Sequence, residues 1–298
     1  MTESAEASSE AQCRLCGAAA HPLGVVYGDF SGRDYELWRC GRCRFAFIGD
    51  PWTEFGRIYD DRYYTGQGAD PLVDYRFELA HADRTIRRYE WNGIVRVVEE
   101  LLGRLDGLSW LDFGCGNGGL VRHLLAYTGV GASGFEQGSI AREASKLGVP
   151  IISEQALEEH AGGFDVVTAI EVLEHTLDPL AELRRIRRLL RPGGLLFVTT
   201  GNAAPFAARL PKWSYVVPEI HISLFEPETL AYAMREAGFR PEQVSHDGGF
   251  DQILKFKLLK NLRIRRRNRM IDLVPARPLA ALVERRLRLG EHPVGWAS

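Results

Sequence analysis

A cluster of glycines after a short apolar run is the part of the chain best suited to bind a ligand through its backbone. Four glycines fall within residues 114–119, between a run that carries Asp112 and a helical apolar pattern over residues 120–125. Glycine has no Cβ, so a strand, a glycine turn and a helix N-terminus in this order let the backbone approach a ligand closely. The next apolar run, residues 131–135, ends in Glu136, which is placed to accept hydrogen bonds from a ribose diol.

The acidic residue ahead of the glycines bears on which nucleotide this turn would bind. A dinucleotide site favours the spacing G-x-G-x-x-G, with a pyrophosphate at the helix N-terminus. Here the order is Asp112, Gly114, Gly116, Gly118. A carboxylate at that place would repel a pyrophosphate but suits the ammonium group of a methionine-like ligand. The alternative is a tight strand-to-helix turn that binds nothing.

A second set of chemically capable residues follows another predicted strand. The apolar and β-branched run of residues 163–170 is typical of a buried central strand. It leads into the acidic and histidine-containing segment Glu171–His175, and then into a helical pattern over residues 180–190. A Pro-Gly-Gly turn that ends at Gly194 stops this helix, and residues 195–200 form the next predicted strand.

In their types and order these segments resemble the class I S-adenosylmethionine (SAM)-dependent methyltransferases, over roughly residues 90–245. The stretch 163–200 is similar to the ubiquinone-biosynthesis O-methyltransferases and to many natural-product enzymes. The resemblance implies an α/β fold with a Rossmann-like, doubly wound sheet, and SAM as the cofactor. The residues expected to contact the cofactor are Asp112, Gly114, Gly116, Gly118, Glu136, Gln137, Glu154, Gln155, Glu171 and Tyr64.

Four of the five cysteines form two closely spaced pairs near the N-terminus, at Cys13 and Cys16 and at Cys40 and Cys43. Two such pairs can supply a tetrahedron of thiolates, the preferred site for Zn²⁺. A stretch of this length cannot build its own core, so we expect a small zinc ribbon. Because four cysteines leave no open coordination position, the zinc would be structural. Two disulfides are the alternative, and the fifth cysteine, Cys115, is expected to be a small filler in the glycine turn.

Residues 49–82 are rich in aromatic side chains and connect the predicted ribbon to the catalytic domain. The string from Ile58 to Gly66 resembles the linker of methyltransferases that carry such a ribbon, including deoxysugar C-methyltransferases. Tyr63 and Tyr64 could therefore lie over the substrate or over the sulfonium of SAM, where cation–π attraction contributes about 0.5–2 kcal/mol. Alternatively these rings only join the two domains.

Methyl transfer requires a group that positions the acceptor and removes its proton. Our first candidate for the general base is His221 and our second is His175, with Glu171 orienting the base or acting as one. A helical turn would bring Glu171 and His175 onto one face and point Glu174 elsewhere. The long segment 201–224 contains several aromatic residues and is expected to form a lid over the substrate. Each histidine has the alternative of a purely structural role.

One departure from the resembled enzymes leaves the acceptor atom open. Sugar C-methyltransferases with the same ribbon place a tyrosine two residues before the Glu-His pair, where this chain has Val172. Methylation of oxygen, carbon or nitrogen is therefore compatible with the sequence.

The most basic part of the chain lies near its C-terminus, with five arginines between Arg263 and Arg269. Another arginine-rich helix is predicted over residues 279–289. Such a run is commonly a solvated face, but it could hold a diphosphate or touch an anionic membrane surface. No strand is evident beyond residue 246, so we predict a basic helical extension over residues 251–298.

Composition narrows the functional classes. The net charge of −2 does not indicate a nucleic-acid partner, and no apolar run reaches the ~20 residues that a membrane span needs. No signal peptide is recognisable, so the cytoplasm is the expected location. We predict an enzyme that methylates a small molecule, as a monomer or homodimer. An RNA methyltransferase with a zinc ribbon and a non-catalytic scaffold are the alternatives.

The predicted organisation has five parts. They are a flexible tail over 1–12, a zinc ribbon over 13–48, an aromatic linker over 49–82, a SAM-binding domain over 83–250 and the helical extension over 251–298.

Overall fold

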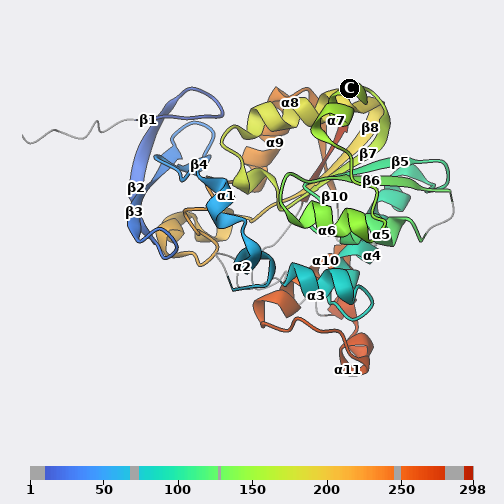
Figure 1. Cartoon of the computed structure of the whole chain (residues 1–298). Coiled ribbons are helices and arrows are strands. Elements are labelled where there is room, and N and C mark those ends of the chain that lie inside the picture. Colours follow the sequence, from blue (N-terminus) through green and yellow to red (C-terminus); the bar gives the residue numbers. More distant parts are fainter. Residues whose placement is uncertain (1–10, 68–73, 127–128, 245–249, 279–291, 298) are drawn as a thin grey trace, which may run out of the picture.

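Two β-sheets organise the protein in this computed structural model (Figure 1). A small antiparallel sheet stands at the N-terminal side, and a larger sheet with helices on both faces forms the main body. The structure describes residues 11–67, 74–126, 129–244, 250–278 and 292–297.

The small sheet combines the N-terminal strands with one strand from much later in the chain. Its strand order is β1-β2-β3-β4-β9, and all neighbours are antiparallel. The strands are Ala11–Gln12, Ala19–Gly28, Arg33–Cys40, Ala46–Ile48 and Ser223–Leu224. Ser223 pairs with Phe47 and Leu224 pairs with Ala46. The end of the segment that we predicted to be a lid is therefore a strand of the ribbon sheet.

Three short helices follow the ribbon: α1 (Phe55–Ile58), α2 (Asp61–Tyr64) and α3 (Tyr75–Ala80). The side chain of Asp60 accepts hydrogen bonds from backbone N–H groups at the start of α2, and Asp74 does the same for α3. Such caps stabilise helices too short to persist alone. Helices α1 and α2 lie between the ribbon and the main body, and α3 lies below the main body (Figure 1).

The large sheet has the strand order β10-β11-β8-β7-β5-β6. The pairings of β5 with β6, β5 with β7 and β7 with β8 are parallel, whereas β11 is antiparallel to both of its neighbours. The strands are β5 (Ser109–Phe113), β6 (Gly131–Phe135), β7 (Phe164–Ile170), β8 (Leu190–Thr199), β10 (Phe239–Val244) and β11 (His292–Ala297). Six of the seven residues of β7 are buried, as expected for a strand covered on both faces.

The two faces of this sheet contact different helices. Trp110 of β5 belongs to a core cluster that includes residues of α4, α5, α6 and α10, whereas the next residue, Leu111, belongs to a cluster with α7, α8 and α9. This alternation confirms the doubly wound α/β fold. The helices are α4 (Arg87–Leu102), α5 (Gly119–Leu124), α6 (Ile140–Lys146), α7 (Glu154–Glu159), α8 (Pro179–Leu189), α9 (Pro227–Glu236), α10 (Phe250–Asn261) and α11 (Arg269–Leu273).

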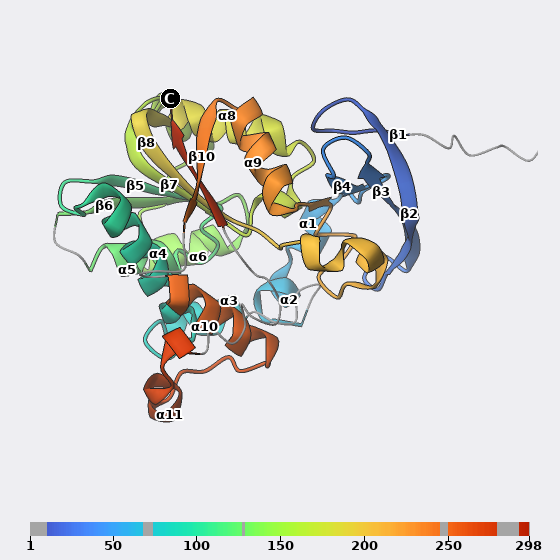
Figure 2. The same cartoon turned by 180° about the vertical axis from the view of Figure 1, so that it is seen from behind.

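The C-terminus differs from the predicted helical extension. After α10 and α11 the chain ends in β11, which inserts between β10 and β8 (Figure 2). This strand contains Pro293 and Gly295, which have low strand propensity, so its place depends on the two neighbours that pair with it. The arginine-rich helix predicted over 279–289 lies outside the described residues.

The N-terminal prediction is also modified. Ala11 and Gln12 belong to β1, although we assigned them to the flexible tail, and the rest of that tail lies outside the described residues. Among the residues that the structure describes, none of the helices has both the length and the apolar character required for a transmembrane segment.

Candidate active site

A cavity of about 2390 Å³ opens beyond the carboxyl ends of the parallel strands. Residues that follow β5, β6, β7 and β8 line it, among them Gly116, Glu136, Glu171 and Thr200. Ligands of doubly wound sheets bind at this edge. A single small-molecule pocket typically measures about 300–1,000 Å³, so this cavity has room for two ligands side by side.

The glycine turn lies at the floor of this cavity. Gly114 and Gly116 have φ angles of +75° and +55°, a region that side chains other than glycine adopt at a cost. A Cβ at Gly114 would lie 2.6 Å from a methyl group of Val172, so close packing also demands glycine here. Gly118, predicted to contact the cofactor, is not among the cavity-lining residues, and a Cβ there would lie 2.5 Å from Val149.

Glu136 lies across the turn and lines the cavity. Its Oε2 accepts a hydrogen bond from the Gly116 N–H at 2.9 Å, and its Oε1 accepts one from the Gly138 N–H at 2.6 Å. These bonds hold the carboxylate in one orientation. A carboxylate offers about four acceptor sites, so capacity for a ligand diol remains.

Asp112 is buried and is held by the Thr168 hydroxyl, which donates to Oδ1 at 2.8 Å. Burial, opposed by that hydrogen bond and assisted by the charge of Glu136, raises the pKa of Asp112 to about 7. A nearby ammonium group would favour the ionised form. The arrangement therefore suits a ligand that brings a positive charge.

The remaining predicted cofactor contacts separate into two groups. Gln137 lines the cavity and donates a hydrogen bond to Glu154. Glu154 itself forms an ion pair with Arg185, and Gln155 donates to Glu159 on the exposed side of α7. Neither Glu154 nor Gln155 is among the cavity-lining residues.

Four tyrosines of the linker line the same cavity as the glycine turn. The rings of Tyr63 and Tyr64 lie 5.4 Å apart edge to face, and Tyr75 stacks on Tyr63 at 5.8 Å. A Cβ at Gly116 would lie only 3.1 Å from the Tyr75 ring, so the linker closes directly over the turn. Tyr63 and Tyr64 belong to the main hydrophobic core and also line the cavity with Tyr59. Their position over the sulfonium of a bound cofactor stays a prediction.

Glu171 ends β7 in an unusual backbone conformation, with a φ of +54°. Such strained residues are commonly found at functional sites. Its Oε1 accepts a hydrogen bond from Lys257 Nζ of α10 at 2.6 Å. Burial by itself would raise the pKa of Glu171, but the charges of Lys257 and Lys260 outweigh burial and lower that pKa well below the usual range. Glu171 is therefore ionised at neutral pH.

Glu174 corrects one expectation from the sequence. Leu173–His175 form a 3₁₀ turn, and Glu174 points into the protein, where it accepts hydrogen bonds from the hydroxyls of Tyr215 and Thr200. We had expected a helical turn that would point Glu174 elsewhere. Side chains three residues apart align in a 3₁₀ turn, which brings Glu174 to the same side as Glu171. The Tyr215 hydroxyl therefore contacts both carboxylates, and it donates to Glu171 at 3.3 Å.

The two candidate bases lie together, with their rings 5.0 Å apart. Burial and the charge of His221 lower the pKa of His175 to about 3, which makes His175 a poor base at neutral pH. The Nδ1 of His221 bonds the carbonyl oxygen of Tyr215, which can only accept, so Nδ1 carries the proton. In the neutral ring the lone pair then belongs to Nε2, and this geometry favours His221 as the base.

The same cluster has a second chemical capability. Ligand atoms of Glu174, His175 and His221 all lie within 4.8 Å of one another, close enough to hold one divalent cation. The sequence analysis did not identify this cluster because Glu174 was expected to point away from it.

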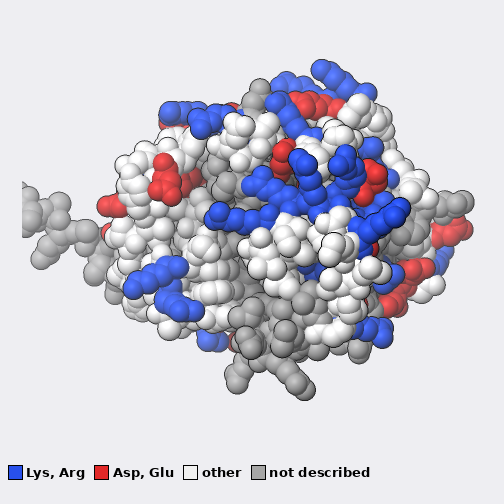
Figure 3. Space-filling view, turned by 90° about the horizontal axis from the view of Figure 1, so that it is seen from below, with Lys and Arg blue, Asp and Glu red and all other residues white. Residues whose placement is uncertain are grey.

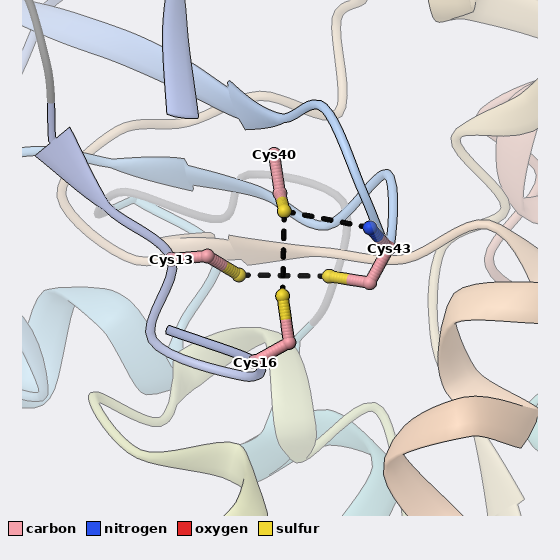
Figure 4. Close-up of side chains that lie close together, drawn as sticks. All are labelled: Cys13, Cys16, Cys40 and Cys43. Carbon is pink, nitrogen blue, oxygen red and sulfur yellow. Dashed lines mark hydrogen bonds between the residues drawn. The ribbon is translucent and has the colours of Figure 1, made fainter. Parts of the chain in front are cut away.

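The four paired cysteines also come together. Sulfur atoms of Cys13 and Cys43, and of Cys16 and Cys40, lie 3.5 Å apart, and all four point toward one centre (Figure 4). A disulfide would measure about 2.05 Å, so these cysteines are not bonded in pairs. The spacing suits four thiolates around a single ion with bonds of about 2.3 Å.

Arg14 connects this cysteine cluster to the candidate bases. It lies between Cys13 and Cys16, and its guanidinium donates to the carbonyl oxygens of Ile222 at 3.1 Å and Leu177 at 3.2 Å. Ile222 follows His221 directly, and Leu177 is two residues after His175. The ribbon and the histidines are thus held by the same side chain.

The sequence analysis did not identify several residues that the structure places at the site. Lys257 reaches Glu171 across 86 residues of chain, and Asp29 and Phe30 at the tip of the ribbon hairpin line the cavity. Buried Glu219 holds that tip by accepting hydrogen bonds from the backbone of Phe30 and Ser31.

The family model described as "Methyltransferase domain" matches residues 84–244 of this chain. Two curated relatives carry the name ubiquinone biosynthesis O-methyltransferase. The Bordetella avium enzyme is 30% identical over 185 residues, which cover 55% of this chain and 73% of the relative. The Caulobacter vibrioides enzyme is 37% identical over 139 residues, 44% of this chain and 53% of the relative. The chain thus matches only about half the length of the second relative.

One similar solved structure is phosphoethanolamine N-methyltransferase 2 of Haemonchus contortus in complex with S-adenosyl-L-methionine. It is 17% identical with a TM-score of 0.49, and the match covers 84% of this chain and 60% of that one. An S-adenosylmethionine-dependent methyltransferase from Aquifex aeolicus is 15% identical with a TM-score of 0.42, covering 56% of this chain and 90% of that one.

The position of Glu136 predicts a specific loss of ligand affinity. We expect Glu136→Gln to weaken binding of S-adenosylhomocysteine about 10- to 100-fold, because hydrogen bonds to a charged group contribute about 1.5–3 kcal/mol. Isothermal titration calorimetry would measure this. Glu154→Gln is the matched control and should bind like the wild type, since Glu154 does not line the cavity. Equal losses in both variants would contradict the assignment.

The raised pKa of Glu174 leads us to predict that the stability of the folded protein depends on pH. Burial and the charge of Glu171 raise the pKa of Glu174 from 4.5 to about 8 in the folded protein. Between these values the folded state holds a proton that the unfolded state has lost. This contribution to stability is therefore complete below about pH 4.5 and is lost as the pH rises toward 8, by up to about 1.4 kcal/mol per pH unit.

Thermal unfolding between pH 5 and pH 8 would measure that contribution. Glu174→Gln should flatten the decline of the melting temperature over this range. Glu236→Gln, on the exposed face of α9, should leave the decline unchanged. An identical pH profile for wild type and Glu174→Gln would show that Glu174 is already ionised in the folded protein.

Proposed function

This chain belongs to the methyltransferase domain family, and we propose that it uses S-adenosylmethionine to methylate a hydroxyl oxygen of a small-molecule acceptor. The observation that carries this proposal is the presence, in one cavity, of the glycine turn with Glu136 and of the His175–His221 pair. The names of the curated relatives support oxygen as the acceptor atom. No observation favours RNA as the acceptor.

The cavity residues fit S-adenosylmethionine on their own chemistry. Gly116 presents backbone without a Cβ, and Glu136 is oriented to accept from a diol. A cationic ligand group would favour the ionised form of Asp112, whose pKa is raised, and the Tyr64 ring lines the same cavity. When bound, S-adenosylmethionine would supply a methyl group on a positively charged sulfur.

His221 would act on the acceptor. Its Nδ1–H is held by the Tyr215 carbonyl and its ring stacks on Tyr215 at 4.1 Å, so Nε2 is presented in a defined direction to take the acceptor's proton. Neutral His175, bonded to the Tyr59 hydroxyl at 3.2 Å, would orient the acceptor. Ionised Glu171 stabilises the imidazolium that forms at His221.

Water exclusion comes from the aromatic segments on both sides of the site. Phe206, Trp213 and Tyr215 stack successively at 4.7 Å, and this row ends at His221. Such a wall suits an acceptor with a flat or apolar body. It also keeps the proton transfer between the acceptor and His221 separate from bulk solvent.

We further propose that the four cysteines hold a structural Zn²⁺. The short sulfur–sulfur distances, with all four sulfur atoms directed at one centre, support thiolate ligands around a single ion. Through Arg14 and β9 this metal would maintain the position of His221.

The catalytic proposal can be tested with isotopically labelled S-adenosylmethionine and a panel of phenols and alcohols. Wild-type protein should methylate at least one hydroxyl acceptor. His221→Gln should lower kcat by about 100-fold or more and leave the affinity for S-adenosylhomocysteine unchanged. Tight cofactor binding without transfer to any hydroxyl, or full activity of His221→Gln, would overturn the proposed role.

The zinc proposal predicts a local change in hydrogen exchange. Elemental analysis should find about one zinc ion per chain in the wild type, and less in Cys16→Ser. Loss of the ion should accelerate amide exchange in β4 and β9, because the ribbon sheet would lose its anchor. The glycine turn over 114–119 is the internal control and should exchange at its original rate. Unchanged amide exchange in β9 would contradict the proposal that the metal maintains the position of His221.

A further inference from the structure

An apolar projection stands at the bottom of the molecule, where α11 extends away from the main body (Figures 1 and 2). On α11, Met270 and Leu273 are 79% and 83% exposed. Val274, directly after α11, is 43% exposed, and Leu262, directly after α10, is 61% exposed. Together they are four of the ten large hydrophobic residues exposed among the described residues. Exposed apolar patches that recur in one place indicate an interaction site.

Packing and hydrogen bonds fix the position of α11 on the main body. Ile271 packs against the core cluster formed by α4 and α10. Lys255, only 3% exposed, donates to the carbonyl oxygens of Ile271 at 2.8 Å and Val274 at 2.7 Å. Met270 and Leu273 are three residues apart and share the opposite side of α11, so the same contacts keep them turned toward solvent.

A second attachment strengthens this orientation. The Tyr89 hydroxyl donates to Asp272, and Asp272 also pairs with Arg267 at 2.7 Å. Asp272 is the one carboxylate in residues 260–274, and it is already used by these partners. These polar contacts hold α11 with its apolar side chains turned outward.

The surroundings of the projection are strongly basic. Lys and Arg side chains gather on this face of the molecule (Figure 3). The cations of the segment are Lys260, Arg263, Arg265, Arg266, Arg267 and Arg269. Among the described residues, no carboxylate forms an ion pair with Arg263 or Arg269, and both are exposed. With six cations and one carboxylate, this segment is far more positive than the whole chain, whose net charge is −2.

We propose that residues 260–274 form a docking surface for an anionic lipid bilayer. A segment that combines exposed apolar side chains with exposed arginines matches the chemistry of a membrane interface, where apolar groups enter the acyl boundary and cations meet lipid phosphates. A nucleic acid would use the arginines but would leave Met270 and Leu273 without a role. The charge complementarity thus identifies a bilayer as the occupant.

The docking surface adjoins the active-site cavity. Lys260, Asn261 and Arg263 line the cavity as well as the surface. A bilayer bound here would lie at the cavity mouth, where an apolar acceptor could enter from the lipid. This consequence rests on the proposed function, whereas the docking itself does not.

Vesicle co-sedimentation with the full chain tests the proposal. The probes are vesicles of phosphatidylcholine alone and of phosphatidylcholine with 30% phosphatidylglycerol. We expect binding to the anionic vesicles that weakens at least about tenfold when the salt concentration is raised from 0.1 M to 1 M, because the screening length falls from about 10 Å to 3 Å. Met270→Ser/Leu273→Ser and Arg266→Gln/Arg269→Gln, which remove exposed side chains that do not line the cavity, should each reduce binding about tenfold.

Matched control variants test whether the loss of vesicle binding is specific to residues 260–274. Leu125→Ser/Leu147→Ser removes two exposed leucines elsewhere, and Arg235→Gln/Arg240→Gln removes two exposed arginines elsewhere; both should bind vesicles like the wild type. Affinity for S-adenosylhomocysteine should be unchanged in all four variants, which shows that they are folded.

Several outcomes would overturn the proposal. They are absence of vesicle binding, equal binding to neutral vesicles, or equal losses in the control variants. Light scattering that shows a dimer dispersed by Met270→Ser/Leu273→Ser, without vesicle binding, would identify the surface as a contact between two copies of the chain.

Discussion

The pairing of β9 with β4 is the constraint on which the candidate active site depends. It adds a strand that begins two residues after His221 to the edge of the ribbon sheet. Backbone hydrogen bonds between strands tolerate little displacement, so the ribbon and His221 must move together. Arg14 adds a second connection from the cysteine knuckle to the same segment. The ribbon is thus a structural part of the active site rather than an appended module.

A buried network of charges accounts for the rest of the site's geometry. Ionised Glu171 is compensated by Lys257, while Glu174 keeps its proton more readily and accepts from Tyr215. Ionising both of two neighbouring carboxylates costs free energy because the like charges repel each other. The different partners of Glu171 and Glu174 therefore give them different pKa values. Because Lys257 belongs to α10, the C-terminal helices contribute to the chemistry as well as to the basic docking surface.

Much of the central fold could be predicted from the sequence. The strand, glycine turn and helix around Gly116, the buried strand that ends at Glu171, and the four cysteines all follow from local patterns. Apolar periodicity, glycine conformation and metal-ligand spacing are patterns of a few residues each, so they can be recognised in the sequence without the structure. The same methods failed for β11, whose residues have weak strand propensity and acquire their structure from β8 and β10.

The sequence by itself determined the doubly wound sheet, the glycine turn and the clustering of cysteines, because each leaves a recognisable local pattern of residues along the chain. Only the tertiary structure decided that Glu174 turns toward His175 and His221, that Lys257 neutralises Glu171, and that Glu154 and Gln155 lie outside the cavity. These outcomes depend on side chains that are distant along the chain and meet only after folding. Their burial and partner charges, rather than their local pattern, set their protonation and their direction.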